Sequence, residues 1–148
     1  MNNDLMFSSR KDDWETPQAF FEKLDEEFDF TFDAAANENN SKCASYSKDA
    51  LNDIWEGRVF CNPPYGRNVT GKFIEKGYEE FMTGISDLIV FLVPARTDTK
   101  WFHEYVYGKA EIRFLKGRLK FEINGKPLLD KHGRAMPAPF PSMLVIYK

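Results

Sequence analysis

The chain has 148 residues, 43% of them hydrophobic and 29% charged, which predicts one soluble globular domain. No apolar run approaches the length of a membrane-spanning helix, and the N-terminus lacks the pattern of a signal peptide. Cys43 and Cys61 have no CxxC spacing and no histidine cluster beside them, so we expect free thiols. We assign neither His103 nor His132 to a metal.

The net charge of −3 is divided unevenly along the chain. Residues 1–57 hold five Lys and Arg against 14 Asp and Glu, whereas residues 58–148 hold 15 against nine. A basic half could meet phosphate while an acidic half avoids it, as in nucleic-acid-binding proteins. Solvated surface lysines explain the same numbers equally well.

Residues 1–13 are polar and show no periodicity, which predicts a mobile N-terminal arm ahead of a single domain over residues 14–148. Thr16 and Pro17 have the pattern of a helix start, with Thr16 as N-cap and Pro17 at the first helical position. The apolar residues that follow recur at helical spacing and are predicted to pack in the core: Phe20, Phe21, Leu24 and Phe28.

Residues 28–33 alternate between apolar and polar side chains, which predicts a strand ending at Asp33. Three alanines follow, and such small residues let a ligand approach the backbone closely. A carboxylate at a strand end can bind hydroxyls or an ammonium group. An alanine-rich turn after an edge strand is the alternative interpretation.

The central feature of the sequence is R-V-F-C-N-P-P-Y-G, residues 58–66. Val59 and Phe60 favour a half-buried strand, whereas two prolines remove two backbone donors and cannot continue a sheet. The pattern predicts a stiff loop at the carboxyl end of a strand, which is where ligands bind in open α/β sheets.

Such a loop suits methylation of a planar amino group, whose lone pair is held in a π system and is a poor nucleophile. The Asn62 side-chain oxygen and the Pro63 carbonyl can each accept one N–H of that amine, and Pro64 shapes the loop. Tyr65 can lie flat against an extruded base. The alternative is a proline-stiffened turn with Tyr65 packed in the core.

Residues 70–82 have helical periodicity, and the apolar run at 87–94 predicts a buried strand. A strand, helix and strand of this length imply a parallel pair with a right-handed crossover. Both strands then end at the same edge of the sheet, which predicts Arg96 and Thr97 beside Asn62. Arg96 is therefore a phosphate-binding candidate, with a salt bridge to a local acid as the alternative.

Residues 98–107 predict a short aromatic-rich helix. Residues 110–115 and 118–123 both alternate, which predicts a hairpin turning at Lys116 and Gly117, with Lys116, Arg118 and Lys120 as a basic rim. Residues 124–141 predict a long functional or mobile loop. Residues 142–147 predict the last strand.

Asn-Pro-Pro-Tyr after a strand is the catalytic signature of amino-methyltransferases that use S-adenosylmethionine. The chain resembles the small phage-type DNA adenine-N6 methyltransferases in segments that follow one another over almost its whole length: residues 14–17, 32–35, 62–65, 94–103, 117–121 and 139–142. The resemblance implies S-adenosylmethionine as cofactor, DNA as partner and the cytoplasm of a bacterial host cell as location.

The resemblance also implies roles for individual residues. The cofactor candidates are Trp14, Thr16, Pro17, Asp33, Ala34 and Asp49. The DNA candidates do not come from the resemblance but are basic residues near the predicted site and in the basic rim: Arg67, Arg96, Lys116 and Arg118. Residues 14–17 would line the methionine end of the cofactor. Residues 48–51 would lie beside its adenine, with Asp49 accepting from the adenine amino group, although a helix N-cap explains Asp49 equally well. The glycine-rich cofactor loop usual after the first strand is missing, and residues 37–40 read Asn-Glu-Asn-Asn in its place.

We therefore expect an α/β fold: a trimmed Rossmann-like methyltransferase sheet, mostly parallel with antiparallel C-terminal strands. It is trimmed because only roughly twenty residues separate Asp33 from the catalytic strand, fewer than a strand–helix–strand crossover takes. The expected reaction is direct methyl transfer to adenine N6 in DNA, without a metal or a covalent intermediate. The sequence shows no separate target-recognition domain, so specificity is short, degenerate or supplied by residues 124–141.

Three alternatives remain open from the sequence. The same loop serves methylation of cytosine N4 and of protein glutamine. A nucleic-acid-binding relative that has lost cofactor binding is the third, which the missing glycine loop permits.

Overall fold

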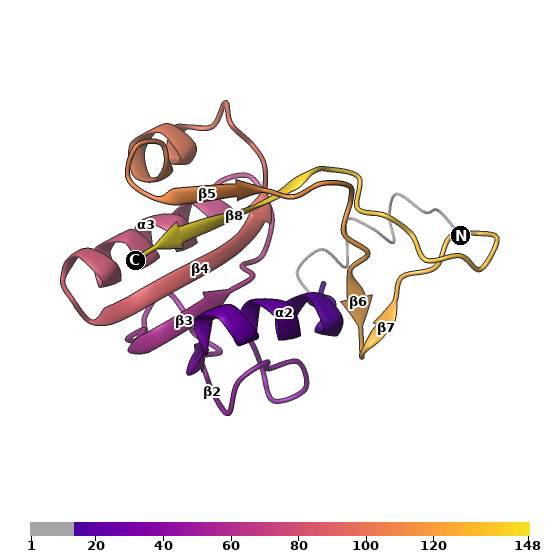
Figure 1. Cartoon of the computed structure of the whole chain (residues 1–148), viewed down its shortest axis with the longest axis horizontal. Helices are drawn as coiled ribbons and strands as arrows, with labels where there is room; N and C mark the ends of the chain where they lie inside the picture. Colours follow the sequence, from indigo (N-terminus) through magenta and orange to yellow (C-terminus); the bar gives the residue numbers. More distant parts are fainter. Residues whose placement is uncertain (1–13) are drawn as a thin grey trace.

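The computed structural model describes residues 14–148, so the predicted N-terminal arm lies outside the described residues. A six-stranded sheet lies at its centre, in the order β2-β1-β3-β4-β8-β5 (Figure 1). The strands are β1 (Phe32–Asp33), β2 (Ser45–Tyr46), β3 (Gly57–Cys61), β4 (Ser86–Pro94), β5 (Glu111–Phe114) and β8 (Ser142–Tyr147).

The first four of these strands are parallel, and β8 runs antiparallel to β4 and to β5. This confirms the predicted α/β class and the mostly parallel sheet with antiparallel C-terminal strands. The register pairs Cys61 with Phe91, so β3 and β4 end at the same edge, as their spacing predicts.

Two apolar cores lie on opposite faces of the sheet because β4 is buried on both sides. Leu88, Val90 and Leu92 face α2 (Gln18–Phe28), whereas the alternate residues of β4 face α3 (Thr70–Met82). Figure 1 shows the two helices on the two faces. The predicted helix at 70–82 and the predicted strands at 87–94 and 142–147 are confirmed, with β4 one residue longer.

A glycine allows α3 to lie close to the sheet. A Cβ atom at Gly77 would lie 2.4 Å from Phe91 Cζ and 3.0 Å from Trp55 Cζ3. Glycine usually weakens a helix, but here its missing side chain is what lets the helix backbone pack against an aromatic ring.

The start of the first helix differs from the prediction by one residue. Pro17 is the N-cap residue, with φ −54° and ψ 130°, and Thr16 makes no capping hydrogen bond. The carboxylate of Glu122, far along the chain, instead accepts the Gln18 N–H at 3.2 Å. A long-range acceptor thus replaces the local cap that the sequence pattern favours.

The strand predicted over residues 28–33 is wrong for most of its length. The helix continues to Phe28, Asp29 ends it in the left-handed conformation with φ 52°, and only Phe32–Asp33 forms a strand. Phe28 fits both the helical and the alternating pattern, and packing of the helical face decides between them. The strand nonetheless ends at Asp33, as predicted.

The hairpin predicted over residues 110–123 is also wrong, because β5 pairs with β8. Two short strands, β6 (Glu122–Ile123) and β7 (Lys126–Pro127), form a hairpin instead. Asn124 and Gly125 connect them with φ of 55° and 76°, the left-handed pair that a type I′ turn requires. Before β5, the predicted helix is a short π-helix, η2 (Phe102–Val106).

Residues 115–141, between β5 and β8, form an extension that we call the ribbon, which projects beyond the edge of the sheet (Figure 1). Backbone hydrogen bonds hold it together: Leu128 N–H donates to the Phe121 carbonyl and Met136 N–H to the Leu128 carbonyl, at 3.2 and 2.7 Å. The segment predicted as a long loop is therefore an ordered part of this ribbon.

Candidate active site

A polar pocket, which we call the first pocket, lies at the carboxyl ends of β1 and β3, with a volume of about 190 Å³. Strand β1 pairs with β2 on one side and with β3 on the other, so the strand order reverses at this point. This is the position at which open α/β sheets bind ligands. The lining includes Trp14, Thr16, Asp33, Lys42, Asn62 and Pro64.

The Asn62 side chain is held at both ends of its amide. Its Oδ1 accepts the Tyr65 hydroxyl at 2.5 Å, and its Nδ2 donates to the Trp14 carbonyl at 3.2 Å. The Pro63 carbonyl accepts no hydrogen bond from any residue of the described chain. Asn62 Oδ1 therefore keeps one lone pair free at the first pocket. Pro63 is buried and lines neither pocket, so its role as the second acceptor stays a prediction.

The loop is fixed to the helix that follows it. The Thr70 hydroxyl donates to the Pro64 carbonyl at 3.1 Å and accepts the Gly66 N–H at 3.2 Å. Thr70 itself is buried at the first turn of α3. The two prolines and this one threonine hold the position of the loop, which suits a site that must orient a substrate.

Tyr65 lies in the core in this structure, with 7% of its surface exposed. Its ring meets those of Phe121 and Phe140 nearly edge-on, at centroid distances of 5.9 and 5.5 Å, and its hydroxyl is 3.0 Å from the Leu92 carbonyl. Burial raises the pKa of its phenol well above the usual range. In this structure Tyr65 is packed in the core, which is the alternative given from the sequence. Stacking of Tyr65 on an extruded base stays a prediction.

Asp33 supplies the buried carboxyl of the first pocket, with 3% of its surface exposed. Its Oδ2 accepts the Lys42 N–H at 2.9 Å and its Oδ1 accepts the Ala35 N–H at 3.3 Å. Loss of solvent on burial raises the pKa of Asp33 to about 6, despite these hydrogen bonds. A cation or a hydroxyl donor in the first pocket would compensate for that loss.

The asparagine loop at residues 37–40 orders itself through side chains. Asn37 Oδ1 accepts the Asn39 N–H at 2.8 Å, and Asn40 Oδ1 accepts the Asn37 N–H at 2.8 Å. Such turns take the place of the missing glycine-rich loop, and the run of asparagines was the signal for them. Sequence analysis missed four residues of the lining: Asn37, Asn40, Lys42 and Ser47. Lys48 and Ala50, which belong to the segment predicted beside the cofactor adenine, also line the pocket.

Three of the six cofactor candidates, Trp14, Thr16 and Asp33, line the first pocket, and Pro17, Ala34 and Asp49 do not. Ala34 is buried, and its N–H donates to the Phe60 carbonyl, so the alanines that follow it form the wall instead. Asp49 is exposed, and its carboxylate accepts the Asn52 side-chain amide at 3.0 and 3.1 Å. No helix begins at Asp49, so its reading as an N-cap is wrong.

A second pocket of about 950 Å³ borders the same loop and contains Arg67 and Arg96. Lys116 and Arg118 do not line it, because they lie at the base of the ribbon, where Arg118 Nη1 donates to the Ala138 carbonyl at 3.2 Å. Arg96 makes no salt bridge within residues 14–148, and its guanidinium lies 5.9 Å from the centroid of the Phe140 ring.

Thr97, predicted beside Asn62, lines neither pocket. Its carbonyl is hydrogen-bonded to His103 Nε2 at 2.8 Å.

The two cysteines are free thiols, as predicted. Burial raises the pKa of Cys43 to about 12 and raises the pKa of Cys61 well above its usual range, so neither is a thiolate at neutral pH. Among residues 14–148 no group of His, Cys, Asp and Glu could hold a metal ion. None of the helices in this part of the chain is long and apolar enough to cross a membrane.

An Asn-Pro-Pro-Tyr loop beside a polar pocket at the switch point of a mostly parallel sheet defines the class of amino-methyltransferases. The chain belongs to the DNA N-6-adenine-methyltransferase (Dam) family, whose family model matches residues 5–148. It is 31% identical over 121 residues to the DNA N-6-adenine-methyltransferase of Escherichia phage T1. That alignment covers 78% of this chain and 49% of the phage protein, so the chain spans about half the length of this relative.

Proposed function

We propose that the chain transfers a methyl group from S-adenosylmethionine to the N6 amino group of adenine in DNA. Residues 14–148 would form one domain whose sheet is a trimmed Rossmann-like methyltransferase sheet. The observation that carries the proposal is Asn62, whose amide is held at the rim of a polar pocket with one acceptor lone pair free. Family membership supports the same chemistry.

The first pocket has the chemistry that the cofactor needs. Asp33 is a buried carboxyl that an ammonium group or ribose hydroxyls would compensate, and Trp14 and Thr16 would bound the methionine end. Ala35 and Ala36 leave room for close approach to the backbone. When bound, S-adenosylmethionine supplies an electrophilic methyl group on a sulfonium sulfur.

Asn62 and Pro63 would orient the amine. Asn62 Oδ1 and the Pro63 carbonyl would each accept one N–H of the adenine amino group, which draws the nitrogen out of conjugation and directs its lone pair at the methyl group. Pro64 keeps the loop rigid through its carbonyl, which Thr70 binds. The carbon–sulfur bond of the cofactor would break as the carbon–nitrogen bond forms, leaving a neutral thioether, and the methylated nitrogen would lose its proton to solvent. Direct transfer of this kind needs neither a metal nor a covalent intermediate.

Tyr65 and the second pocket would receive the base and its strand. Tyr65 borders that pocket beside Arg67 and Arg96, so an extruded adenine could lie against it once Phe140 moves aside. The two arginines would bind phosphates next to the target nucleotide, and Lys116 and Arg118 would contact the duplex further out.

A methylation assay tests the proposal. The protein is incubated with unmethylated duplex DNA and labelled S-adenosylmethionine, the DNA is digested to nucleosides, and the products are identified by mass spectrometry. N6-methyladenine is the expected product. N4-methylcytosine would retain the mechanism and change the base. Methylated glutamine in a parallel reaction with protein in place of DNA would move the substrate to protein. If the assay shows no transfer and calorimetry shows no cofactor binding, the non-catalytic relative is favoured.

A further inference from the structure

The ribbon concentrates positive charge in a chain that is acidic overall. Residues 115–141 carry six Lys and Arg against two acids, a net charge of +4 in a chain of −3. All six cations are exposed: Lys116, Arg118, Lys120, Lys126, Lys131 and Arg134. An excess of one sign on a projecting element is the electrostatic pattern of an anion-binding surface.

These cations have no ionic partner in the described part of the chain. Five basic residues elsewhere form salt bridges there: Lys48, Lys76, Lys100, Arg113 and Lys148. The two acids of the ribbon are already engaged by backbone groups. Glu122 Oε1 accepts the Gln18 N–H, and Asp130 Oδ1 accepts two N–H groups within the tip. The positive charge of the ribbon is therefore left for a partner.

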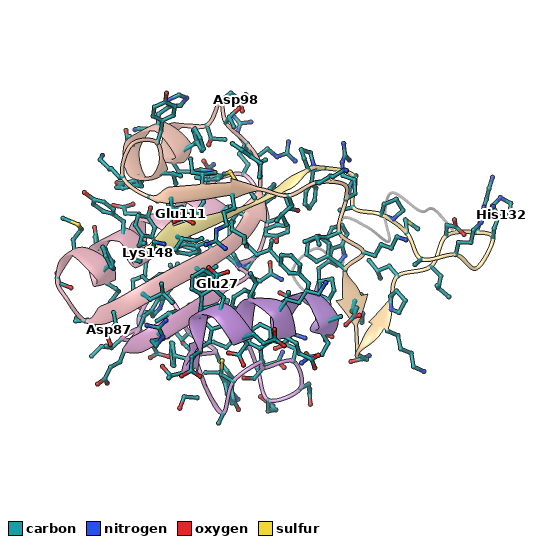
Figure 2. All side chains as sticks on the ribbon, in the orientation of Figure 1. Glu27, Asp87, Asp98, Glu111, His132 and Lys148 are labelled. Atoms are coloured by element: carbon teal, nitrogen blue, oxygen red, sulfur yellow. The ribbon has the colours of Figure 1, made fainter. Side chains whose placement is uncertain are left out.

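The tip of the ribbon has a defined shape. Asp130 Oδ1 accepts the N–H groups of His132 and Arg134 at 2.8 and 3.0 Å, and Asp130 N–H donates to the Arg134 carbonyl. Gly133 completes the turn with φ 77°. Lys131 and Arg134 are therefore presented on an ordered turn, which Figure 2 shows, with His132, at the far end of the ribbon.

The base of the ribbon is joined to the active-site loop. Phe121 and Phe140 stack against the Trp14 ring at 5.2 and 6.1 Å, and the Trp14 carbonyl accepts the hydrogen bond from Asn62. The backbone of Glu15 exchanges two hydrogen bonds with that of Glu122. The ribbon thus starts beside the catalytic amide and carries its charge outward from that point.

We propose that the ribbon is a DNA-docking element, in which Lys126, Lys131 and Arg134 bind phosphates along the major groove beside the target base. The inference rests on the proposed function and assigns the contact with duplex DNA outside the catalytic pockets. A narrow β-ribbon has the dimensions that the major groove admits. A protein partner fits less well, because lysine is depleted at protein interfaces and Leu129 is the sole large exposed hydrophobic residue of the ribbon.

Salt-dependent binding tests the proposal without requiring catalysis. The affinity of the full chain for a fluorescent DNA duplex is measured by anisotropy between 50 and 200 mM salt for wild type and for the double variant Lys131→Gln/Arg134→Gln. The slope of log affinity against log salt is negative, and each lost phosphate contact reduces its magnitude by about 0.9. We therefore expect the slope of the double variant to be smaller in magnitude by about 1.8. At saturating DNA we expect kcat to be unchanged and KM for DNA to rise.

The control variant, Lys23→Gln/Lys148→Gln, removes the same formal charge from α2 and from the C-terminal end, where Lys148 pairs with Glu111. Its slope should stay at the wild-type value. An unchanged slope in the ribbon variant, or an equal loss in the control, overturns the proposal. Equal binding of an RNA duplex, with the same loss in the ribbon variant, overturns groove docking, because the major groove of A-form RNA is too narrow. Wild-type binding without methyl transfer would sink the proposed function and leave this inference standing.

Discussion

The Tyr65 hydroxyl donates to Asn62 Oδ1 at 2.5 Å, while the Trp14 carbonyl accepts from Asn62 Nδ2 at 3.2 Å. The amide can therefore neither rotate nor exchange its oxygen and nitrogen without losing one of these bonds. Because an amide oxygen has two lone pairs, one remains for a substrate N–H. The aromatic residue of the loop thus has a positioning contact in addition to the stacking role predicted from sequence.

Tyr65→Phe tests this positioning contact, because it keeps the ring and removes the hydroxyl. We expect kcat to fall about three- to tenfold, the value of one hydrogen bond of roughly 1 kcal/mol, with little change in the cofactor Kd. Single-turnover kinetics with labelled cofactor would measure it. Tyr65→Ala serves as the comparison, since losing the ring should also raise KM for DNA. A Tyr65→Phe enzyme with wild-type kcat contradicts the positioning role.

Asn62→Ala removes the proposed amine acceptor itself. We expect kcat to fall by at least about 100-fold, because the lost interaction forms with charge that develops in the transition state. Cofactor Kd and thermal stability should change little, since Asn62 is only partly buried. Asn52→Ala is the matched control, because the Asn52 amide binds only the exposed carboxylate of Asp49. Retained turnover in Asn62→Ala would refute the assigned chemistry.

The elements predicted best from sequence are those whose pattern fits only one type of secondary structure. The apolar run of β4 and the helical period of α3 specify the β3-α3-β4 unit, and the site follows because both strands end at one edge. Asn62 follows β3 and Asp33 ends β1, and both are predicted as site residues because they lie at the carboxyl ends of strands. Lys42 and Ser47 could not be found this way, because an irregular loop carries them to the first pocket.

The failures come from long-range partners and from a competing turn signal. Nothing near Thr16 indicates that Glu122 will cap the helix from the ribbon. The hairpin predicted to turn at Lys116-Gly117 lies elsewhere, because Asn124-Gly125 is the stronger type I′ signal. That dipeptide, read with its flanking residues, would have located β6 and β7.

Asp33 predicts a pH dependence of cofactor binding. Its pKa of about 6 means that the carboxyl is mostly protonated at pH 5 and ionised at pH 7. If the carboxylate binds the cofactor ammonium or hydroxyls, affinity should rise about tenfold between these pH values and level off above them. Calorimetry in buffers of different ionisation heat should show proton release at pH 5 to 6 for wild type and none for Asp33→Asn. An identical pH profile in both proteins would exclude Asp33 as the cofactor carboxylate.

The same raised pKa has a consequence for the free protein. Because the folded state holds the Asp33 proton more tightly than the unfolded state, the stability of the wild type falls relative to Asp33→Asn as pH rises from about 4 to 6. The relative loss should approach about 3 kcal/mol. Urea unfolding at pH 4 and pH 7.5 would measure it, and a difference independent of pH would contradict it.

The two glycines of α3 should respond differently to alanine. At Gly77 the added Cβ would lie 2.4 Å from Phe91 Cζ, in a core where Phe91 is fully buried. At Gly71 it would lie 3.0 Å from Trp101 Cδ1, and half-buried Trp101 has room to shift. Overpacking lowers the free energy of unfolding by about 1–3 kcal/mol, whereas the higher helix propensity of alanine raises it by up to about 1 kcal/mol. We expect urea unfolding to show a net loss of about 1–2 kcal/mol for Gly77→Ala and near neutrality for Gly71→Ala, and equal values would contradict this account.

Glu15 should determine how firmly the β6–β7 turn is held. Its two carboxylate oxygens accept the N–H groups of Asn124 and Gly125 at 3.2 and 3.1 Å, and its backbone pairs with Glu122. Glu15→Ala removes the first contacts and keeps the second, so we expect amide exchange at Asn124 and Gly125 to accelerate about fivefold per hydrogen bond of roughly 1 kcal/mol. Glu26→Ala, on the exposed surface of α2, is the control. Unchanged exchange would show that the β6–β7 pairing alone holds the turn, and that the N-terminal segment does not brace the ribbon there.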